Sequence, residues 1–210
     1  MLILTLTILN FPVGCPIMLD VESEIRRLTE LMPASGRMLT KIVSKPKQSR
    51  VIDAAFPKPW QRGDRLIAIN FNLWADLSLG ERDLLLLSVV CYLVQIRWFK
   101  PDIYQGLTLA GMAGVGLQLW QRDAVGMVIA GGLTAIAAQQ IWNNYRSNER
   151  EIEADAGAIK IAERRGYEPA MAAKLLLSAI ENTVQIEQRS SLSFTELIRC
   201  QNLRTLALNT

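Results

Sequence analysis

The chain has 210 residues, half of them hydrophobic and a fifth charged, and its formal net charge is +3. This length suffices for one domain with a hydrophobic core, or for a small domain together with a membrane element. The net charge is too small to indicate a nucleic-acid partner. Because the sequence contains no histidine, it excludes every catalytic or metal site that depends on an imidazole.

The first 17 residues are apolar and contain no lysine or arginine. A secretory signal peptide needs a basic first region, so this stretch is not predicted to be one. Our favoured interpretation is an over-extended start, with translation beginning at Met18. The alternative is a short tail that touches a membrane.

An amphipathic helix is predicted over Asp20–Met32, because apolar residues recur there at intervals of three and four. The sequence Pro33–Gly36 is predicted to end this helix. Residues 37–65 are expected to be irregular, apart from short strands at 38–43 and 50–54.

Basic residues dominate this irregular stretch and are open to two interpretations. They form either a solvated surface or a contact with anionic lipid headgroups, where each basic residue contributes ~1 kcal/mol. The candidate lipid contacts are Arg37, Lys41, Lys45, Lys47, Arg50 and Lys58.

A strand is predicted at Leu66–Phe71, and after it a helix that starts behind the N-cap Ser78 and runs through Asp83–Arg97. Ser78 and Glu81 have the spacing of a capping box, in which each side chain accepts a hydrogen bond from the other residue's N–H group. The helix is apolar at nearly every position, which indicates burial on most faces.

Two long apolar segments follow, Ile103–Trp120 and Ala124–Trp142. As helices they are about 27 to 29 Å long, close to the ~30 Å thickness of a bilayer core. They predict a two-helix transmembrane hairpin with both ends on the cytoplasmic side, since lysine and arginine gather outside the turn. The alternative is a soluble helical protein that buries the hairpin.

Three more helices are predicted after the hairpin. The first covers Glu149–Arg165 and ends at Gly166, and the second covers Pro169–Glu187. A second capping box, Ser193 with Glu196, starts the last helix.

The order of strand, capped helix, hairpin and the pentapeptide Glu151–Asp155 resembles that of the membrane-embedded zinc metalloproteases of the CAAX prenyl-protease and heat-shock-protease type. The resemblance implies that Glu151 stands at the position of the third zinc ligand and Asp155 at that of an aspartate behind the ligands. In that family the helix before the hairpin carries His-Glu-x-x-His. Counted from Asp83, which matches a family acidic residue, the motif falls on Val90, Cys91 and Val94.

These residues cannot form a catalytic zinc site, which needs three protein ligands and an open position. The resemblance therefore implies a pseudoprotease with no catalytic residue, metal or cofactor. Its vestigial metal-site positions are Val90, Cys91, Val94, Glu151 and Asp155. Our favoured interpretation of Glu151 and Asp155 is that they complement the helix dipole and pair with Arg146 or Arg150.

An alternative is a hydrolase with a relocated site that uses Ser88 or Cys91. Cys91 has no histidine to deprotonate it, and an apolar setting raises a thiol pKa, so a core thiol is the favoured interpretation. A base for Ser88 is not evident, although a Ser–Lys pair stays open. The three cysteines are predicted to be reduced.

The chain from Met18 onward also resembles a small family of cyanobacterial proteins known only as a domain of unknown function. The matching stretches are Leu31–Arg37, Trp98–Asp102 and Arg199–Arg204. This resemblance implies a photosynthetic membrane and supplies no activity.

The predicted fold is mainly α with a small β element, a metalloprotease-like helical domain interrupted by the transmembrane hairpin. The expected parts are the tail 1–17, the N-terminal part 18–102, the hairpin 103–142 and the C-terminal part 143–210. The predicted function is a non-catalytic scaffold, binding or assembly factor on the cytoplasmic face of a thylakoid or plasma membrane. Its expected partners are membrane lipids and a membrane-protein complex, with a homodimer as a further expectation and no nucleic acid.

Overall fold

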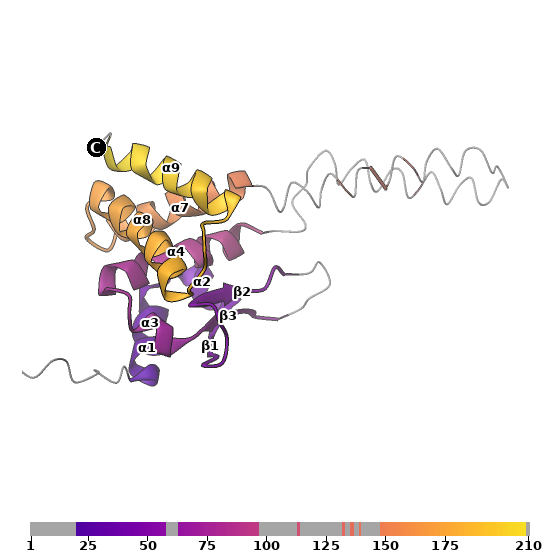
Figure 1. Cartoon of the computed structure of the whole chain (residues 1–210). Helices are drawn as coiled ribbons and strands as arrows, with labels where there is room; N and C mark the ends of the chain where they lie inside the picture. Colours follow the sequence, from indigo (N-terminus) through magenta and orange to yellow (C-terminus); the bar gives the residue numbers. More distant parts are fainter. Residues whose placement is uncertain are drawn as a thin grey trace, which may run out of the picture.

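The computed structural model describes residues 20–57, 63–96 and 148–208, together with the single positions 113, 132, 135, 136 and 139. These residues form a mainly helical domain with one small three-stranded sheet (Figure 1). The first 17 residues, Lys58 and the expected hairpin at 103–142, apart from those single positions, lie outside the described residues. Among the helices that are described, none is long and apolar enough to cross a membrane.

The predicted first helix is confirmed as α1 (Val21–Leu31), and a short helix follows it. The carboxylate of Asp20 caps α1 by accepting a hydrogen bond from the N–H group of Glu22 at 3.3 Å. The predicted end of this helix before Pro33 is confirmed, but α2 (Ala34–Leu39) begins directly after Pro33 and covers 37–39, the first residues of the stretch that was expected to be irregular. A Cβ atom on Gly36 would lie 2.6 Å from Cγ1 of Val90, so the glycine lets α2 approach the following long helix.

The sheet contains β1 (Thr40–Ser44), β2 (Ile52–Ala54) and β3 (Arg65–Ile69), in the order β1-β3-β2. β1 runs parallel to β3, with Thr40 opposite Arg65, and β2 runs antiparallel to β3. The three predicted strands are confirmed to within two residues at each end.

Helices α3 (Phe71–Trp74) and α4 (Leu79–Gln95) follow β3. The predicted capping box is confirmed: the N–H group of Ser78 donates to the Glu81 carboxylate at 2.8 Å, and the Glu81 N–H donates to Ser78 Oγ at 3.4 Å. The helix begins at Leu79, directly after the predicted N-cap Ser78, and ends at Gln95, two residues before the predicted end. It is buried on most faces, as its composition predicts.

Three helices complete the domain: α7 (Asn148–Glu163), α8 (Pro169–Ile186) and α9 (Phe194–Leu208). The chain reverses after α7 at Gly166, whose φ of +96° is in the left-handed region, and the Tyr167 N–H donates to the Ala162 carbonyl at 3.1 Å. The capping box of α9 is confirmed as well, with the Ser193 N–H 2.7 Å from the Glu196 carboxylate.

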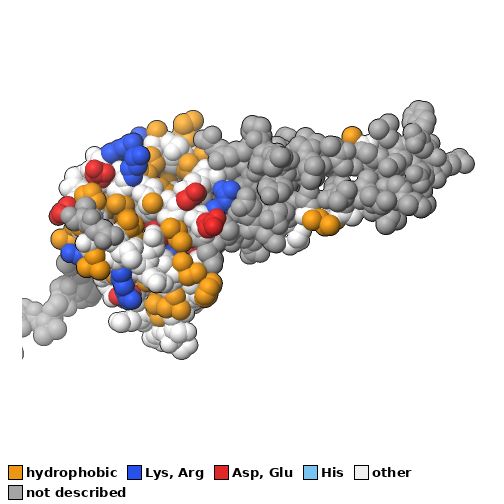
Figure 2. All heavy atoms as spheres, turned by 90° about the horizontal axis from the view of Figure 1, so that it is seen from above, with side chains coloured by type: hydrophobic (Ala, Val, Ile, Leu, Met, Phe, Trp, Pro, Cys, Tyr) orange, Lys and Arg blue, Asp and Glu red, His pale blue; other side chains and the backbone are white. Residues whose placement is uncertain are grey.

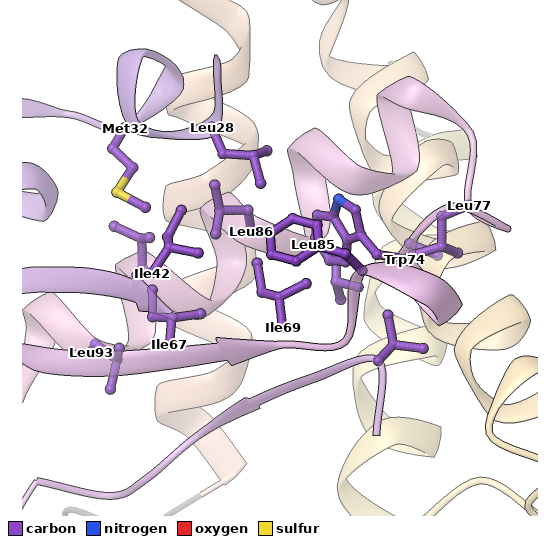
Figure 3. Close-up of a cluster of buried hydrophobic side chains, with 14 residues drawn as sticks. Leu28, Met32, Ile42, Ile67, Ile69, Trp74, Leu77, Leu85, Leu86 and Leu93 are labelled. Atoms are coloured by element: carbon purple, nitrogen blue, oxygen red, sulfur yellow. The ribbon is translucent and has the colours of Figure 1, made fainter. Parts of the chain in front are cut away.

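The hydrophobic core consists of two clusters, and α4 contributes to both. The first cluster joins α1, the sheet, α3 and one side of α4 around Trp74 (Figure 3). The second joins α4 to α7, α8 and α9, and α7 contributes three fully or almost fully buried alanines, Ala154, Ala158 and Ala162. Such small side chains allow two helix backbones to approach closely, which holds α7 against α4.

Candidate functional site

Two adjoining hollows lie between β2, α4, α7 and the start of α9. Their volumes are about 320 and 390 Å³. Both are lined by Arg50, Ile52, Val89, Glu151 and Arg199, so together they form one polar cavity. We call it the arginine cavity, because Arg199 lies at its centre and the charged groups around it determine what it can bind.

Arg199 links three residues from two other helices. Its Nε and Nη2 atoms donate to the two carboxylate oxygens of Asp155, at 2.8 and 2.7 Å. Nη2 also donates to Ser88 Oγ at 3.0 Å, and Nη1 lies 3.5 Å from Glu151 Oε2. The Ser88 hydroxyl donates in turn to Asp155 Oδ1 at 2.6 Å. This geometry places one guanidinium group between two carboxylates of α7, those of Asp155 and Glu151.

Asp155 and Glu151 differ in burial and therefore in electrostatics. Asp155 is fully buried and has a bidentate ion pair, the geometry in which arginine binds a carboxylate most strongly. The side chain of Glu151 is 34% exposed and faces the cavity. Its burial raises the pKa, Arg199 lowers it, and the nearby Asp155 and Glu196 raise it again, so that the net shift is upward.

The predicted role of Asp155 at the helix start is wrong. Asp155 is the eighth residue of α7, about two turns from its start and beyond the reach of the helix-start dipole, and its partners are Arg199 and Ser88. Glu151 does lie in the first turn, but it also meets Arg199. Arg146, one of the expected partners, lies outside the described residues.

A second ion-pair group closes one side of the cavity. Arg189 donates to both carboxylate oxygens of Glu196, at 2.9 and 2.8 Å, and its Nε lies 2.8 Å from Glu187. Glu187 accepts a hydrogen bond from the N–H group of Val51 at 2.7 Å. These contacts attach the start of β2 to the turn between α8 and α9.

The positions at which the resemblance places the zinc-binding motif do not share one surface. Val90 packs in the first core cluster, on the α2 side of α4, and Val94 packs against the same cluster. Cys91 belongs to the second cluster. The residues of α4 that line the cavity with Glu151 are instead Leu85, Ser88, Val89 and Tyr92.

Cys91 is a buried thiol of the second cluster and is 8% exposed. Burial, with a smaller contribution from Asp155, raises its pKa from 9.0 to about 12. A thiol with this pKa is protonated at neutral pH and is a poor nucleophile. Among the described residues, no group of three or more histidine, cysteine, aspartate and glutamate side chains is arranged to hold a metal ion.

Asp83, which the resemblance matches to a family acidic residue, joins three parts of the chain instead of lining the cavity. It is buried and pairs with Arg27 of α1, and the hydroxyl of Tyr167 donates to it at 2.8 Å. Burial, and then this hydrogen bond, raise the Tyr167 pKa to about 12. Asp83 therefore connects α1, α4 and the turn after α7.

Five of the six candidate lipid contacts are described, and all five side chains are exposed: Arg37, Lys41, Lys45, Lys47 and Arg50. They do not form one patch. Arg50 is at the arginine cavity, where its ion pair with Asp53 is 3.4 Å long and exposed. Basic and acidic side chains lie close together among hydrophobic ones on the face of the domain seen in Figure 2.

The central residue of the cavity, Arg199, could not be recognised from sequence. It is one arginine in an amphipathic helix, and 44 residues separate it from Asp155. The sequence offers one weak signal. An aspartate that is buried needs a positively charged partner, and the last helix supplies arginines that could reach it. Choosing Arg199 among the arginines of the C-terminal part requires the packing of α9 on α7.

The fold and cavity define a small, mainly helical domain with a three-stranded sheet and a polar pocket that is occupied by its own guanidinium group. The chain belongs to the family described as "Protein of unknown function (DUF3318)", which matches residues 26–167. It is 28% identical over 169 residues to a protein named "Thylakoid membrane protein slr1949" from Synechocystis. The match covers 78% of this chain and 77% of that relative. No solved structure matches the chain significantly.

Proposed function

We propose that this protein is a non-catalytic binding or assembly factor on the cytoplasmic face of the thylakoid membrane. The observation that carries the proposal is the contact of Arg199 with both Asp155 and Glu151. These are the two carboxylates that the resemblance assigns to a metal site. A guanidinium group supplies positive charge there without any Lewis acidity.

The hydrolase alternative has little support in the geometry. Ser88 would need a general base, but its hydroxyl donates to a carboxylate that is already paired with Arg199. Both oxygens of that carboxylate already accept hydrogen bonds from Arg199, which is the arrangement of a structural ion pair and not of a general base held ready for a proton. Cys91 lies in the core with a raised pKa. The arginine cavity is thus better suited to binding than to catalysis.

The membrane location is supported by the name of the relative and by the apolar segments of the sequence. In the proposal, 103–142 forms a transmembrane hairpin and both termini are cytoplasmic. Helices α4 and α7 then stand at the membrane surface, since the chain leaves the domain after α4 and returns at α7 (Figure 1). The arginine cavity, which both helices line, would face proteins close to that surface.

The partner would be a subunit of a membrane-protein complex. The cavity offers arginine donors and glutamate acceptors beside apolar side chains. Such a mixture suits a polypeptide segment, which carries donors, acceptors and apolar groups together.

The proposed lack of catalytic activity is tested on the full chain after extraction in mild detergent. We expect no stoichiometric metal by elemental analysis and no hydrolysis of a peptide library. One bound zinc per chain, together with hydrolysis that Glu151→Gln abolishes, would overturn it.

The binding part is tested by affinity purification from thylakoid membranes, with the native mass and the co-purifying proteins as readouts. We expect a large particle with a defined partner, and loss of that partner in Arg50→Glu. Arg204→Glu is the matched control, because the side chains of Arg50 and Arg204 are 67% and 61% exposed and each has one exposed ion pair. A lone monomer or homodimer in the unmodified protein would contradict the proposal.

A further inference from the structure

An exposed surface at one end of the sheet combines apolar and basic side chains. Its members are the last three residues of α2, Arg37, Met38 and Leu39, with Lys41 of the following strand β1 and Leu66 of β3; all five are exposed, and we call them the sheet rim. The apolar members are strongly exposed: Met38 at 78%, Leu66 at 48% and Leu39 at 40%. Lys41 is opposite Leu66 across the parallel pair of strands, which places both side chains on the open face of the sheet.

The sheet rim lies at the end of α4 where the chain leaves the domain. Thr40, which follows the rim residue Leu39, is opposite Arg65 in the sheet. The Arg65 guanidinium donates to the carbonyl groups of Leu93 and Ile96, at the end of α4. The two apolar segments of 103–142 begin only a few residues beyond that point.

We infer that the sheet rim rests on anionic lipid headgroups at the membrane surface. Met38, Leu39 and Leu66 supply apolar surface for the headgroup boundary, and Arg37 and Lys41 supply positive charge beside it. This combination is the one by which proteins bind membrane interfaces. Residues 31–44 contain two basic residues, Arg37 and Lys41, and no acidic one, so the charge of the rim is complementary to an anionic surface.

The structure also distinguishes the basic residues of the sheet rim from basic residues that lie farther along β1. Lys45 and Lys47 follow Ser44 at the opposite end of β1, about 13 Å from Thr40. Salt screens charges over ~8 Å at physiological ionic strength. Reversal of the charge of Arg37 or Lys41 therefore weakens the contact more than reversal at Lys45 or Lys47, although all four side chains are exposed.

The inference rests on the proposed membrane location, and one experiment separates the two. The full chain, with Cys15→Ser to remove the cysteine outside the described residues, is reconstituted into phosphatidylcholine vesicles with and without phosphatidylglycerol. A fluorophore is attached at Met38→Cys, Leu66→Cys or Leu79→Cys, and quenching by lipids with a spin label in the headgroup region is measured. Leu79 is the matched control, because it is 58% exposed but lies at the start of α4, about 24 Å along the helix axis from the end where the chain leaves the domain.

We expect at least about twofold stronger quenching at positions 38 and 66 than at 79, and only in vesicles that contain phosphatidylglycerol. The difference should disappear in Arg37→Glu/Lys41→Glu and persist in Lys45→Glu/Lys47→Glu. Equal quenching at all three positions in chains that float with the vesicles would overturn the inference and leave the membrane location intact. Failure to float with any vesicle would contradict both. Protection of position 38 by a co-purified protein instead of lipid would also overturn the inference.

Discussion

Arg199 and Asp155 form a buried ion pair with two hydrogen bonds, which joins α9 to α7. Ser88 of α4 bonds to both partners, so the pair joins three helices through one polar contact. A buried charge that loses its partner is strongly destabilising, because the remaining group is neither hydrated nor neutralised. The stability of the C-terminal half of the domain should therefore depend on this pair.

Arg199→Met should lower the free energy of unfolding by about 3 to 5 kcal/mol, since it leaves Asp155 buried without a cation. Arg204→Met on the same helix removes an exposed pair and should cost less than about 1 kcal/mol. The double variant Arg199→Met/Asp155→Asn should lose less than the sum of the single variants. Chemical denaturation of the purified protein measures these values, and equal losses at positions 199 and 204 would contradict the expectation.

Glu196 should make the protein more stable at neutral than at acidic pH. Burial raises its pKa, but hydrogen bonds from Arg189 and Ser193 lower the pKa by more than burial raises it, so that the net shift is from 4.5 to about 2. A carboxyl group with a depressed folded-state pKa stabilises the fold above pH 4.5 and loses this contribution as the pH falls toward 2. Glu196→Gln should thus be less stable than the parent at pH 7, and the difference should shrink in denaturation curves below pH 4.5.

Glu151 should show the opposite dependence. Its pKa is raised from 4.5, so the folded state binds its proton more tightly than the unfolded state does. Its stabilising contribution is complete below pH 4.5 and declines as the pH rises through the folded-state pKa. Glu151→Gln mimics the protonated form and should be at least as stable as the parent at pH 7. A clear loss of stability at pH 7, relative to the exposed control Glu149→Gln, would be evidence against this assignment.

Cys91 should resist alkylation in the folded protein. The thiol is 8% exposed and its pKa is raised to about 12, so little reactive thiolate exists at pH 8. Mass spectrometry should find Cys91 unmodified after native treatment with iodoacetamide and modified after unfolding in denaturant. Rapid native labelling, or reaction of Cys91 or Ser88 with a covalent hydrolase probe, would revive the hydrolase alternative.

Val90 should matter for packing and not for chemistry. Gly36→Ala would place a Cβ atom 2.6 Å from Val90 Cγ1, an overpacked contact that typically costs about 1 to 3 kcal/mol. Val90→Ala should rescue part of that loss, because it removes the atom that clashes. If the two substitutions act additively in a double-mutant cycle, α2 and α4 do not meet through this pair.

Local patterns in the sequence were sufficient for most of the secondary structure. The boxes at Ser78 and Ser193 and the stop at Gly166 involve residues within a few positions of one another, so the sequence displays the whole interaction. Helix α2 was missed because Pro33 and Gly36 are both common in turns, whereas here Pro33 precedes a helix and Gly36 allows close packing.

The arginine cavity could be predicted only in part. The spacing of four predicts that Glu151 and Asp155 share one face of a helix, but their partner Arg199 comes from a distant helix. Val90, Cys91 and Val94 do not lie together at the cavity for a similar reason, because a count of residues along α4 does not show which side of the helix faces α7. The contacts of Ser88 with Asp155 and Arg199 identify that side.

Because α4 and α7 pack antiparallel, the chain leaves the domain and returns to it at neighbouring places. The end of α4 and the start of α7 lie on the same side of the domain, and packed helices have axes about 8 to 10 Å apart (Figure 1). Everything encoded between Arg97 and Ser147 is therefore an insertion between two neighbouring points of one folding unit. Its length and composition can change through evolution, or be exchanged by design, without altering the register of the helices that carry the arginine cavity.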